Sequence, residues 1–121
     1  MNRHFAEQWL NNLKEYWFNK DVESAVSLFT RTTYYQEAPF MKPYTTIEEI
    51  NQEWQHIKHE NIQKIEINLL AIDGCTLIAQ WILKQNNKDY DGIYEIKFNE
   101  LNECIYFKSW EMLKKEDENN E

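Results

Sequence analysis

The spacing of hydrophobic residues changes once along the chain, from a helical period to a strand period. In the first part, large apolar residues recur every fourth position, at Phe5, Trp9, Leu13 and Trp17. This spacing predicts an amphipathic helix with a broad aromatic face. From Ile62 onward apolar and polar residues alternate, which predicts strands. The chain therefore divides into a helical part and a sheet-forming part.

Two shorter helices are expected after the first one. Asp21 can cap a helix whose inner face consists of Val22, Ala25, Val26 and Phe29. Thr45 and Thr46 each precede a glutamate by three residues, so either can start a third helix with a capping box. The apolar stripe of that third helix consists of Ile47, Ile50, Trp54 and Ile57.

A short strand is predicted between the second and third helices. Residues 32–35 are β-branched and aromatic, which favours extended backbone. Pro39 ends the strand because it has no N–H to donate to a neighbouring strand. Alternation places Thr33, Tyr35 and Glu37 on one face. We expect that face to line a cavity, and the apolar loop side chains Phe40 and Met41 to lie across its mouth.

Four consecutive strands follow, and turn sequences separate them. Asp73-Gly74 is a strong hairpin signal, and residues 86–88 and 99–103 mark the next two turns. The last strand is expected from about Cys104 to Met112. Consecutive hairpins give an antiparallel meander, so we predict an α+β fold with helices gathered on one side of an antiparallel sheet.

Composition favours one domain with an aromatic interior. The 121 residues include five Trp, seven Tyr and six Phe, more than a minimal core needs. Either the core is rich in rings or a cavity is lined with them. We expect a single domain over residues 1–113 and an acidic, disordered tail over residues 114–121.

Charge and cysteine usage exclude several classes of function. The net charge is −8 and there is no basic stripe, which argues against nucleic-acid binding. No apolar run is long enough for a signal peptide or a membrane span, so a soluble cytoplasmic protein is expected. Cys75 and Cys104 have no metal-ligand spacing, so we expect two buried thiols and no metal or cofactor.

The order of elements resembles the nuclear transport factor 2-like superfamily, and within it the SnoaL-like group. The resemblance covers the chain to about Met112. It is carried by Leu28-Phe29 before the aromatic strand, the exit Glu37-Ala38-Pro39-Phe40, the Thr-capped helix with Trp54, the stretch Gly92-Ile93-Tyr94-Glu95-Ile96-Lys97-Phe98, and Phe107-Lys108-Ser109-Trp110. It implies three helices packed in a curved sheet, a cystatin-like cone with an interior pocket at its open end. Many members are homodimers through the outer sheet face.

Within this superfamily, ketosteroid isomerase offers a comparison for the site. The position of its base, an aspartate at the end of the first strand, corresponds to Glu37. Its two oxyanion donors, a tyrosine on the first helix and a protonated aspartate on the third long strand, correspond to positions near Lys14 and Tyr94. The donor pair of the isomerase is therefore not reproduced, although the Tyr94 hydroxyl can itself donate a hydrogen bond.

Glu37 is the candidate catalytic residue, and it has two interpretations. In an apolar, ring-lined cavity its pKa would be raised, which suits a general base. Alternatively it is solvated at the strand end or paired with a lysine. Tyr35 on the same face is then a wall residue or a hydrogen-bond partner.

The candidate ligand-binding residues are mostly aromatic. Trp54 and Trp81 each suit either a plain core or a cavity wall, whereas together with Trp17 and Tyr94 they exceed what packing demands. On the last strand, Ser109 and Glu111 would face the cavity together with Ile105 and Phe107, leaving Trp110 outside as a dimer contact. A one-residue change of register would exchange these roles.

His56 and His59 lie three residues apart near the end of the third helix. They suit a metal pair, but no third ligand is apparent, and a solvated polar face is the simpler interpretation.

We therefore expect a small-molecule-binding domain, a homodimer through the outer sheet face, with a pocket for a mostly apolar ligand carrying a few polar groups. The first alternative is a SnoaL-like isomerase, cyclase or hydrolase with Glu37 as general base. The second alternative is a dimeric protein-interaction module.

Overall fold

The computed structural model describes residues 1–115 and has the expected α+β architecture. In chain order, its elements are α1 (Arg3–Phe18), α2 (Val22–Ser27), β1 (Tyr34–Gln36), α3 (Ile47–Gln55), the 3-10 helix η1 (His56–His59), β2 (Ile62–Asp73), β3 (Thr76–Gln85), β4 (Lys88–Phe98) and β5 (Cys104–Leu113). The predicted acidic tail falls largely on residues 116–121, which lie outside the described part of the chain.

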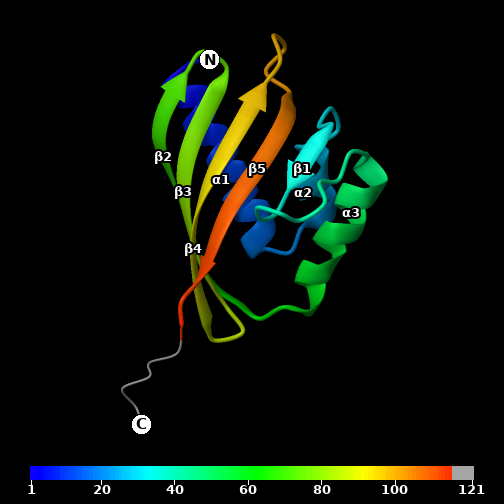
Figure 1. Cartoon of the computed structure of the whole chain (residues 1–121), viewed down its shortest axis with the longest axis vertical. Helices are drawn as coiled ribbons and strands as arrows, with labels where there is room; N and C mark the ends of the chain where they lie inside the picture. The colour runs from blue at the N-terminus through cyan, green and yellow to red at the C-terminus, as the bar shows by residue number, and fades with distance from the viewer. Residues whose placement is uncertain (116–121) are drawn as a thin grey trace.

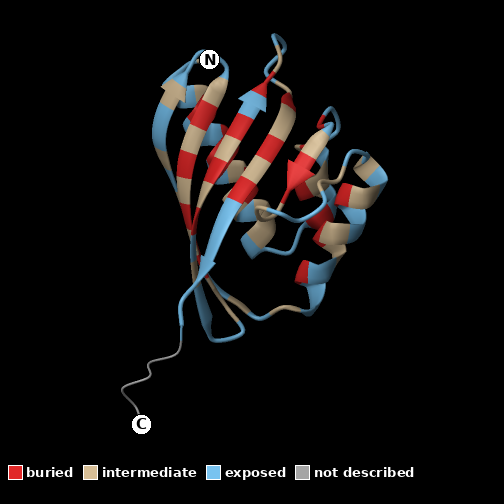
Figure 2. Ribbon diagram, in the orientation of Figure 1, coloured by how far each residue is buried: buried red, intermediate tan, exposed pale blue. Residues whose placement is uncertain are grey.

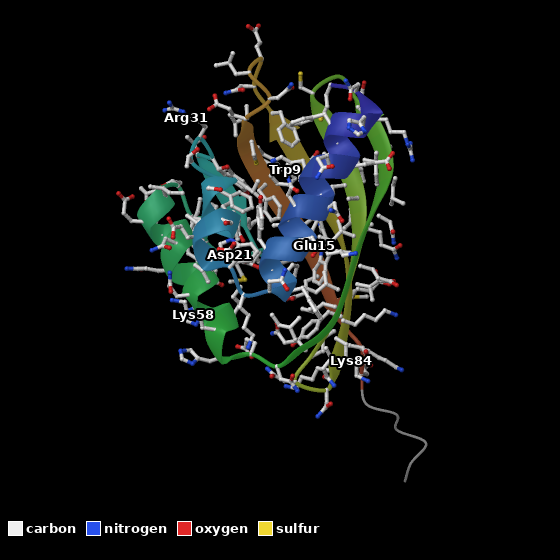
Figure 3. The ribbon with its side chains drawn as sticks, turned by 180° about the vertical axis from the view of Figure 1, so that it is seen from behind. Trp9, Glu15, Asp21, Arg31, Lys58 and Lys84 are labelled. Carbon is white, nitrogen blue, oxygen red and sulfur yellow. The ribbon has the colours of Figure 1, made fainter. Side chains whose placement is uncertain are left out.

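The strands form one mixed sheet in the order β1-β5-β4-β3-β2. Strands β2 to β5 make the predicted antiparallel meander, whereas β1 pairs with β5 in parallel. Helix α1 runs across one face of the sheet, and α2 and α3 lie beside β1 (Figures 1 and 3). The opposite face is not covered by any described helix.

Side chains at the helix starts fix where each helix begins. The Asn2 carboxamide oxygen accepts a hydrogen bond from a backbone N–H in the first turn of α1. The Asp21 carboxylate does the same for α2. For α3, the structure selects one of the two possible capping boxes, the pair Thr46 and Glu49. Each cap satisfies an N–H group that has no partner inside its helix.

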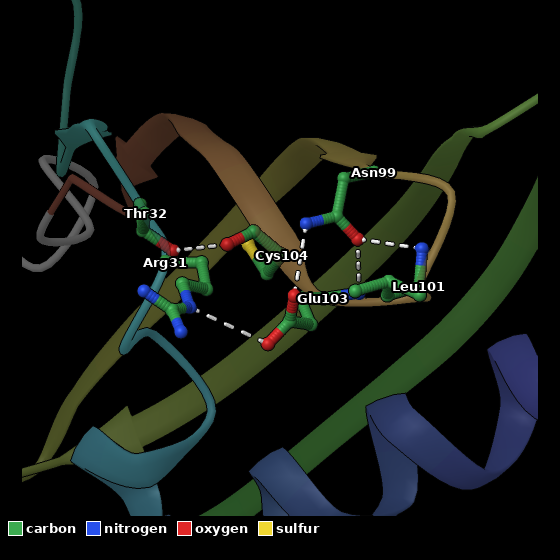
Figure 4. Close-up of polar contacts among 6 residues, drawn as sticks. All are labelled: Arg31, Thr32, Asn99, Leu101, Glu103 and Cys104. Atoms are coloured by element: carbon green, nitrogen blue, oxygen red, sulfur yellow. Dashed lines mark hydrogen bonds and ion pairs between the residues drawn. The ribbon is translucent and has the colours of Figure 1, made fainter.

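A polar cluster attaches the segment before β1 to the start of β5 (Figure 4). The Thr32 hydroxyl donates to the Cys104 carbonyl at 2.8 Å, and Arg31 lies 3.6 Å from the Glu103 carboxylate. Asn99 accepts from the Glu103 N–H at 2.9 Å and thereby shapes the β4–β5 turn. Because Thr32 turns inward to make its bond, the expected alternation does not extend back to Thr33, which is exposed.

The core lies between α1 and the inner face of the sheet. Trp9 of α1 packs edge-on against Phe29 and Phe98, with ring centroids 5.9 and 5.3 Å apart. Every second residue is buried from Leu77 to Leu83 of β3 and from Gly92 to Phe98 of β4, as the alternating bands in Figure 2 show. The alternation predicted for this part of the chain is therefore confirmed in these strands.

The start of β5 departs from the expected alternation. The pairing of β4 with β5 shifts register between Lys97 and Phe98, so that Cys104 lies opposite Phe98. Cys104 is consequently buried, whereas Ile105, which was expected to share the inner face, is not. Beyond this irregularity Phe107 and Ser109 point inward as expected, with 2% exposure each.

The two cysteines differ in environment. Cys104 is the buried thiol that the sequence predicted. The prediction was wrong for Cys75, which is exposed because it occupies the two-residue turn between β2 and β3 beside Gly74, whose φ is +60°.

Candidate functional site

The helices and the sheet enclose a pocket of about 220 Å³. Its walls come from the end of α1, the end of β1, the α3–η1 segment, and the inner faces of β3, β4 and β5. In Figure 1 these elements meet toward the lower end of the molecule, where α3 leads into β2. The lining residues are Trp17, Tyr35, Glu37, Glu53, Trp54, His56, Ile57, Glu60, Trp81, Leu83, Gln85, Tyr94, Phe107, Ser109 and Glu111.

All eight candidate site residues that the sequence suggested line this pocket. They are Glu37, Trp17, Tyr35, Trp54, Trp81, Tyr94, Ser109 and Glu111. The register of β5 turns Ser109 and Glu111 to the pocket side, where Ser109 is buried and Glu111 is exposed, and leaves Trp110 on the outer face, 39% exposed. The ligand of these residues and the catalytic role of Glu37 remain predictions.

Glu37 follows β1 directly and points into the pocket. The pKa of its carboxyl is raised to about 7: burial is the main cause, a hydrogen bond with the Tyr35 hydroxyl opposes the increase, and the nearby Glu53 and Glu111 carboxylates add to it. No ion pair among residues 1–115 involves Glu37. The alternative in which a lysine neutralises Glu37 is therefore not what the structure contains.

Two tyrosine hydroxyls accompany Glu37. Burial raises the pKa of Tyr35 well above its ordinary value, and the charge of Glu37 adds to this effect. The pKa of Tyr94 is raised in the same way by burial and by Glu37 and Glu111, and no hydrogen bond contributes. Both hydroxyls therefore stay protonated at neutral pH; that of Tyr35 is hydrogen-bonded to Glu37, and that of Tyr94 is available as a donor.

The position of the Trp81 ring in the pocket wall depends on a hydrogen bond and on the space left by a glycine. Its indole Nε1 donates to the Ser109 hydroxyl at 3.0 Å. The ring stacks on Tyr94 at a centroid distance of 5.5 Å. It passes over Gly92 of β4, where any Cβ would overlap the indole.

Two other indoles at the pocket have no hydrogen-bond partner. The Nε1 atoms of Trp17 and Trp54 are buried, and neither donates to any group in residues 1–115. Their rings meet edge to face at 5.9 Å. A buried N–H without a partner costs roughly 1–3 kcal/mol, so the two indoles are a destabilising feature of the pocket wall.

The sequence-based analysis missed two carboxylates of the pocket, Glu53 and Glu60. Glu53 lies three residues after Ile50 and four before Ile57, so helical spacing alone places it on the inward stripe of α3. Glu60 follows η1, and Asn86 of the β3–β4 turn donates to its carboxylate. The position of Glu60 depends on that distant turn and carries no local signal.

Two expectations about the surroundings of the pocket are resolved. Phe40 does not cover the mouth: it is fully exposed, its backbone has a φ of +72°, and Met41 is 45% exposed. The loop is instead held by Gln36, whose side-chain amide donates to the Met41 carbonyl at 2.7 Å. His56 lies 3.6 Å from Glu53, and no group of potential metal ligands is found among the described residues.

Comparison with known proteins identifies the fold. No protein-family description matches the chain, and no curated protein sequence matches it significantly. Solved structures do match. A nuclear transport factor 2-like protein of unknown function from Burkholderia xenovorans superposes with a TM-score of 0.71 at 10% identity, over 96% of this chain and 89% of the other. The chain has the nuclear transport factor 2-like fold.

Two further neighbours with this fold have more specific descriptions. One is described as a putative SnoaL-like polyketide cyclase from Shewanella denitrificans, with a TM-score of 0.67 and 11% identity over 88% of this chain and 89% of the other. Another is a protein with a ketosteroid isomerase-like fold from Catenulispora acidiphila, in complex with trimethylamine, with a TM-score of 0.67 and 9% identity over 84% and 83% of the two chains. At these identities the similarity establishes the fold alone. No described helix of this chain is long and apolar enough to span a membrane.

Proposed function

We propose that this protein binds a small molecule with a mostly apolar body in the pocket between its helices and sheet. The observation that supports the proposal is the composition of the walls, where six aromatic side chains surround a few polar groups: Trp17, Tyr35, Trp54, Trp81, Tyr94 and Phe107. Ligand sites have this composition, in which rings supply burial and isolated donors fix orientation. The neighbour in complex with trimethylamine agrees with ligand binding in this fold.

The volume of the pocket limits the size of the ligand. Pockets for drug-sized molecules span roughly 300–1,000 Å³. At about 220 Å³ this cavity suits a smaller molecule, unless its walls move. Compounds with one ring, or short branched chains, are therefore the first to test.

A thermal-shift screen of small carbonyl compounds and lactones tests the binding proposal. We expect hits to raise the melting temperature of the protein, and Tyr94→Phe or Trp17→Phe to reduce that effect. Trp110→Phe on the outer face is the matched control and should leave it unchanged. A crystal structure with side chains filling the cavity, together with no stabilising compound, would overturn the proposal.

Proton transfer is the second candidate function, and the environment of Glu37 favours it. A carboxyl with a pKa of about 7 is half ionised at neutral pH, which is the condition for an effective general base. Glu37 would take a proton from a carbon next to a carbonyl, and the electron pair would move onto the carbonyl oxygen. The Tyr94 hydroxyl would donate to that oxygen, and Glu37 would return the proton to another carbon, which completes an isomerisation.

This second candidate makes a separate demand on Glu37. Glu37→Gln keeps the size and much of the polarity of the side chain, so a ligand should still bind. Turnover should fall by at least a hundredfold, since general bases contribute roughly 10²–10⁴ in rate. The pH profile of kcat/KM should rise through about 7 in the unmodified protein. Unchanged turnover in Glu37→Gln would exclude the catalytic role and leave binding intact.

We also propose that two copies of the chain pair through the outer face of the sheet, whatever the ligand. Trp110 and Met112 are 39% and 74% exposed on that face, which no described helix covers. Exposed large apolar groups on one sheet face favour protein contacts. The same face would be the contact surface if the protein is an interaction module.

A further inference from the structure

The ionisable groups of the pocket are almost all acidic. Four carboxylates line it, those of Glu37, Glu53, Glu60 and Glu111, and the one basic side chain among the lining residues is His56. No lysine or arginine among the described residues lines it. Lys58 and Lys84 belong to elements that form its walls, but Figure 3 places them on opposite outer sides of the molecule. The chain therefore concentrates negative charge in a ring-lined cavity and does not neutralise it with its own cations.

Two of the four carboxylates have protein partners and two do not. Glu53 lies 3.6 Å from His56, and Glu60 accepts a hydrogen bond from Asn86. Glu37 and Glu111 take part in no ion pair among residues 1–115. Glu111 is itself exposed to solvent, but its charge acts on Glu37, and a bound cation would offset that repulsion whereas a neutral or anionic ligand would not.

The aromatic walls suit a cation as well. Trp17 contacts Trp54 at 5.9 Å and Trp81 at 6.3 Å between centroids, so three indoles meet at one corner of the pocket. The face of an indole attracts ammonium groups through the quadrupole of the ring, and rings that surround a cation form the cages that hold quaternary ammonium groups. Rings and carboxylates thus favour the same sign of charge.

A free tyrosine hydroxyl indicates a second feature of the ligand. Tyr94, 5% exposed, lines the pocket, and no hydrogen bond contributes to its raised pKa. Its hydroxyl would donate to a ligand oxygen, which an ammonium group alone does not provide.

We propose that the ligand of this pocket is a small organic cation, a quaternary or protonated amine that also carries an oxygen acceptor. This inference rests on the proposed small-molecule binding and specifies its ligand class. The cationic end lies against the indole faces and the free carboxylates, and the oxygen accepts a hydrogen bond from the Tyr94 hydroxyl.

A matched pair of compounds isolates the effect of charge. Choline and 3,3-dimethylbutan-1-ol have nearly the same shape and hydroxyl group, and differ in a positive nitrogen replaced by carbon. Titrations followed by tryptophan fluorescence and by indole N–H NMR signals would compare their affinities. We expect choline to bind at least tenfold more tightly, and this preference to shrink in high salt.

Variants of the acidic lining locate the effect. Glu111→Gln should reduce the preference for choline by at least threefold without weakening the neutral alcohol. Glu48→Gln, on the exposed side of α3, removes the same charge outside the pocket and is the control. Circular dichroism would confirm that both variants are folded.

The outcomes separate the inference from the function on which it rests. Equal affinity for the two compounds, or tighter binding of the alcohol, would overturn the cationic ligand and keep small-molecule binding. If neither compound binds while neutral carbonyl compounds stabilise the protein, the cationic ligand is likewise excluded. If no compound of either class binds, both the proposed small-molecule binding and the proposed cationic ligand are wrong.

Discussion

The Trp81 indole on β3 donates a 3.0 Å hydrogen bond to the Ser109 hydroxyl on β5, across the intervening strand β4. Both residues are at most 3% exposed. The contact is possible because β4 has Gly92 at the point where the indole crosses it. One wall of the pocket is therefore fixed by three strands acting together.

Gly92→Ala should disrupt this wall. The added methyl group would overlap the Trp81 ring and the Trp110 carbonyl, and the carbonyl belongs to a paired strand that cannot move freely. We expect a loss of about 1–3 kcal/mol in the free energy of unfolding, as for other overpacked positions. Urea denaturation would measure it. Gly74→Ala is not a suitable control, because Gly74 has a positive φ. Ala71→Gly, at an exposed position of β2, is the comparison variant that leaves the pocket unchanged.

Ser109→Ala should leave the Trp81 N–H buried and unpaired. The expected cost is about 1–3 kcal/mol, the penalty for an unsatisfied buried donor. A double-mutant cycle with Trp81→Phe would assign the cost, since Ser109→Ala should be much less harmful once the N–H is gone. Additive effects of the two substitutions would show that the hydrogen bond contributes nothing.

Glu37 should make the stability of the protein fall as pH rises. Its pKa is raised from an ordinary 4.5 to about 7, a difference of about 2.5 pH units, so the folded state binds more protons than the unfolded state between these values. The contribution of Glu37 to the free energy of unfolding is fully present below about pH 4.5. It is lost progressively as the pH rises from there to about 7. The loss is at most ~3 kcal/mol.

Glu37→Gln removes that dependence. Compared with the unmodified protein, the variant should gain stability as pH increases from 4 to 8, and urea denaturation at several pH values would show it. Glu48→Gln is the control at an exposed position, and its stability should differ from that of the unmodified protein by the same amount at every pH. A constant difference for Glu37→Gln as well would mean that Glu37 is solvated.

Thr46→Ala should destabilise α3, whereas Thr45→Ala should have little effect. The Thr46 hydroxyl accepts from the Glu49 N–H at 3.3 Å, and the Thr45 side chain makes no such bond in the described structure. Loss of an N-cap costs about 1 kcal/mol. Thermal unfolding of the two variants would distinguish the two capping boxes that the sequence allows, and equal losses would contradict the structure.

Trp110→Glu should separate a dimer formed through the outer sheet face. The substitution places a charge at the centre of the exposed apolar group and removes the contact of Lys108 with the Trp110 ring, 4.5 Å from its centroid. Sedimentation at several concentrations would detect the change. Leu101→Glu, 78% exposed in the β4–β5 turn, is the control. A monomer before substitution would rule out this interface.

Local periodicity was sufficient to place most of the site. Tyr35 and Glu37 follow from alternation before a proline, and Trp54 from the helical stripe of α3. The inward direction of Ser109 and Glu111 needed the register of β5, which depends on an irregularity in its pairing with β4. The same irregularity is the reason that Ile105 was placed wrongly.

The errors concern interactions between distant segments. Phe40 was expected over the mouth because apolar loop residues usually pack on something, but the bond from Gln36 to Met41 turns the loop so that the ring faces solvent. Glu60 reaches the pocket wall through Asn86, which lies 26 residues away in sequence. The sequence therefore indicated two pocket carboxylates, Glu37 and Glu111, and the structure adds Glu53 and Glu60 to them.

The attachment of β1 to β5 also determines when the site can form. Thr32 and Cys104 are 72 residues apart in sequence, and strands β2, β3 and β4 lie between them. Closing so large a loop has a high entropic cost, whereas the hairpins from β2 to β5 close over short turns. We therefore expect the meander to assemble first and the strand that leads to Glu37 to dock last, so that the pocket becomes competent only in the final step of folding.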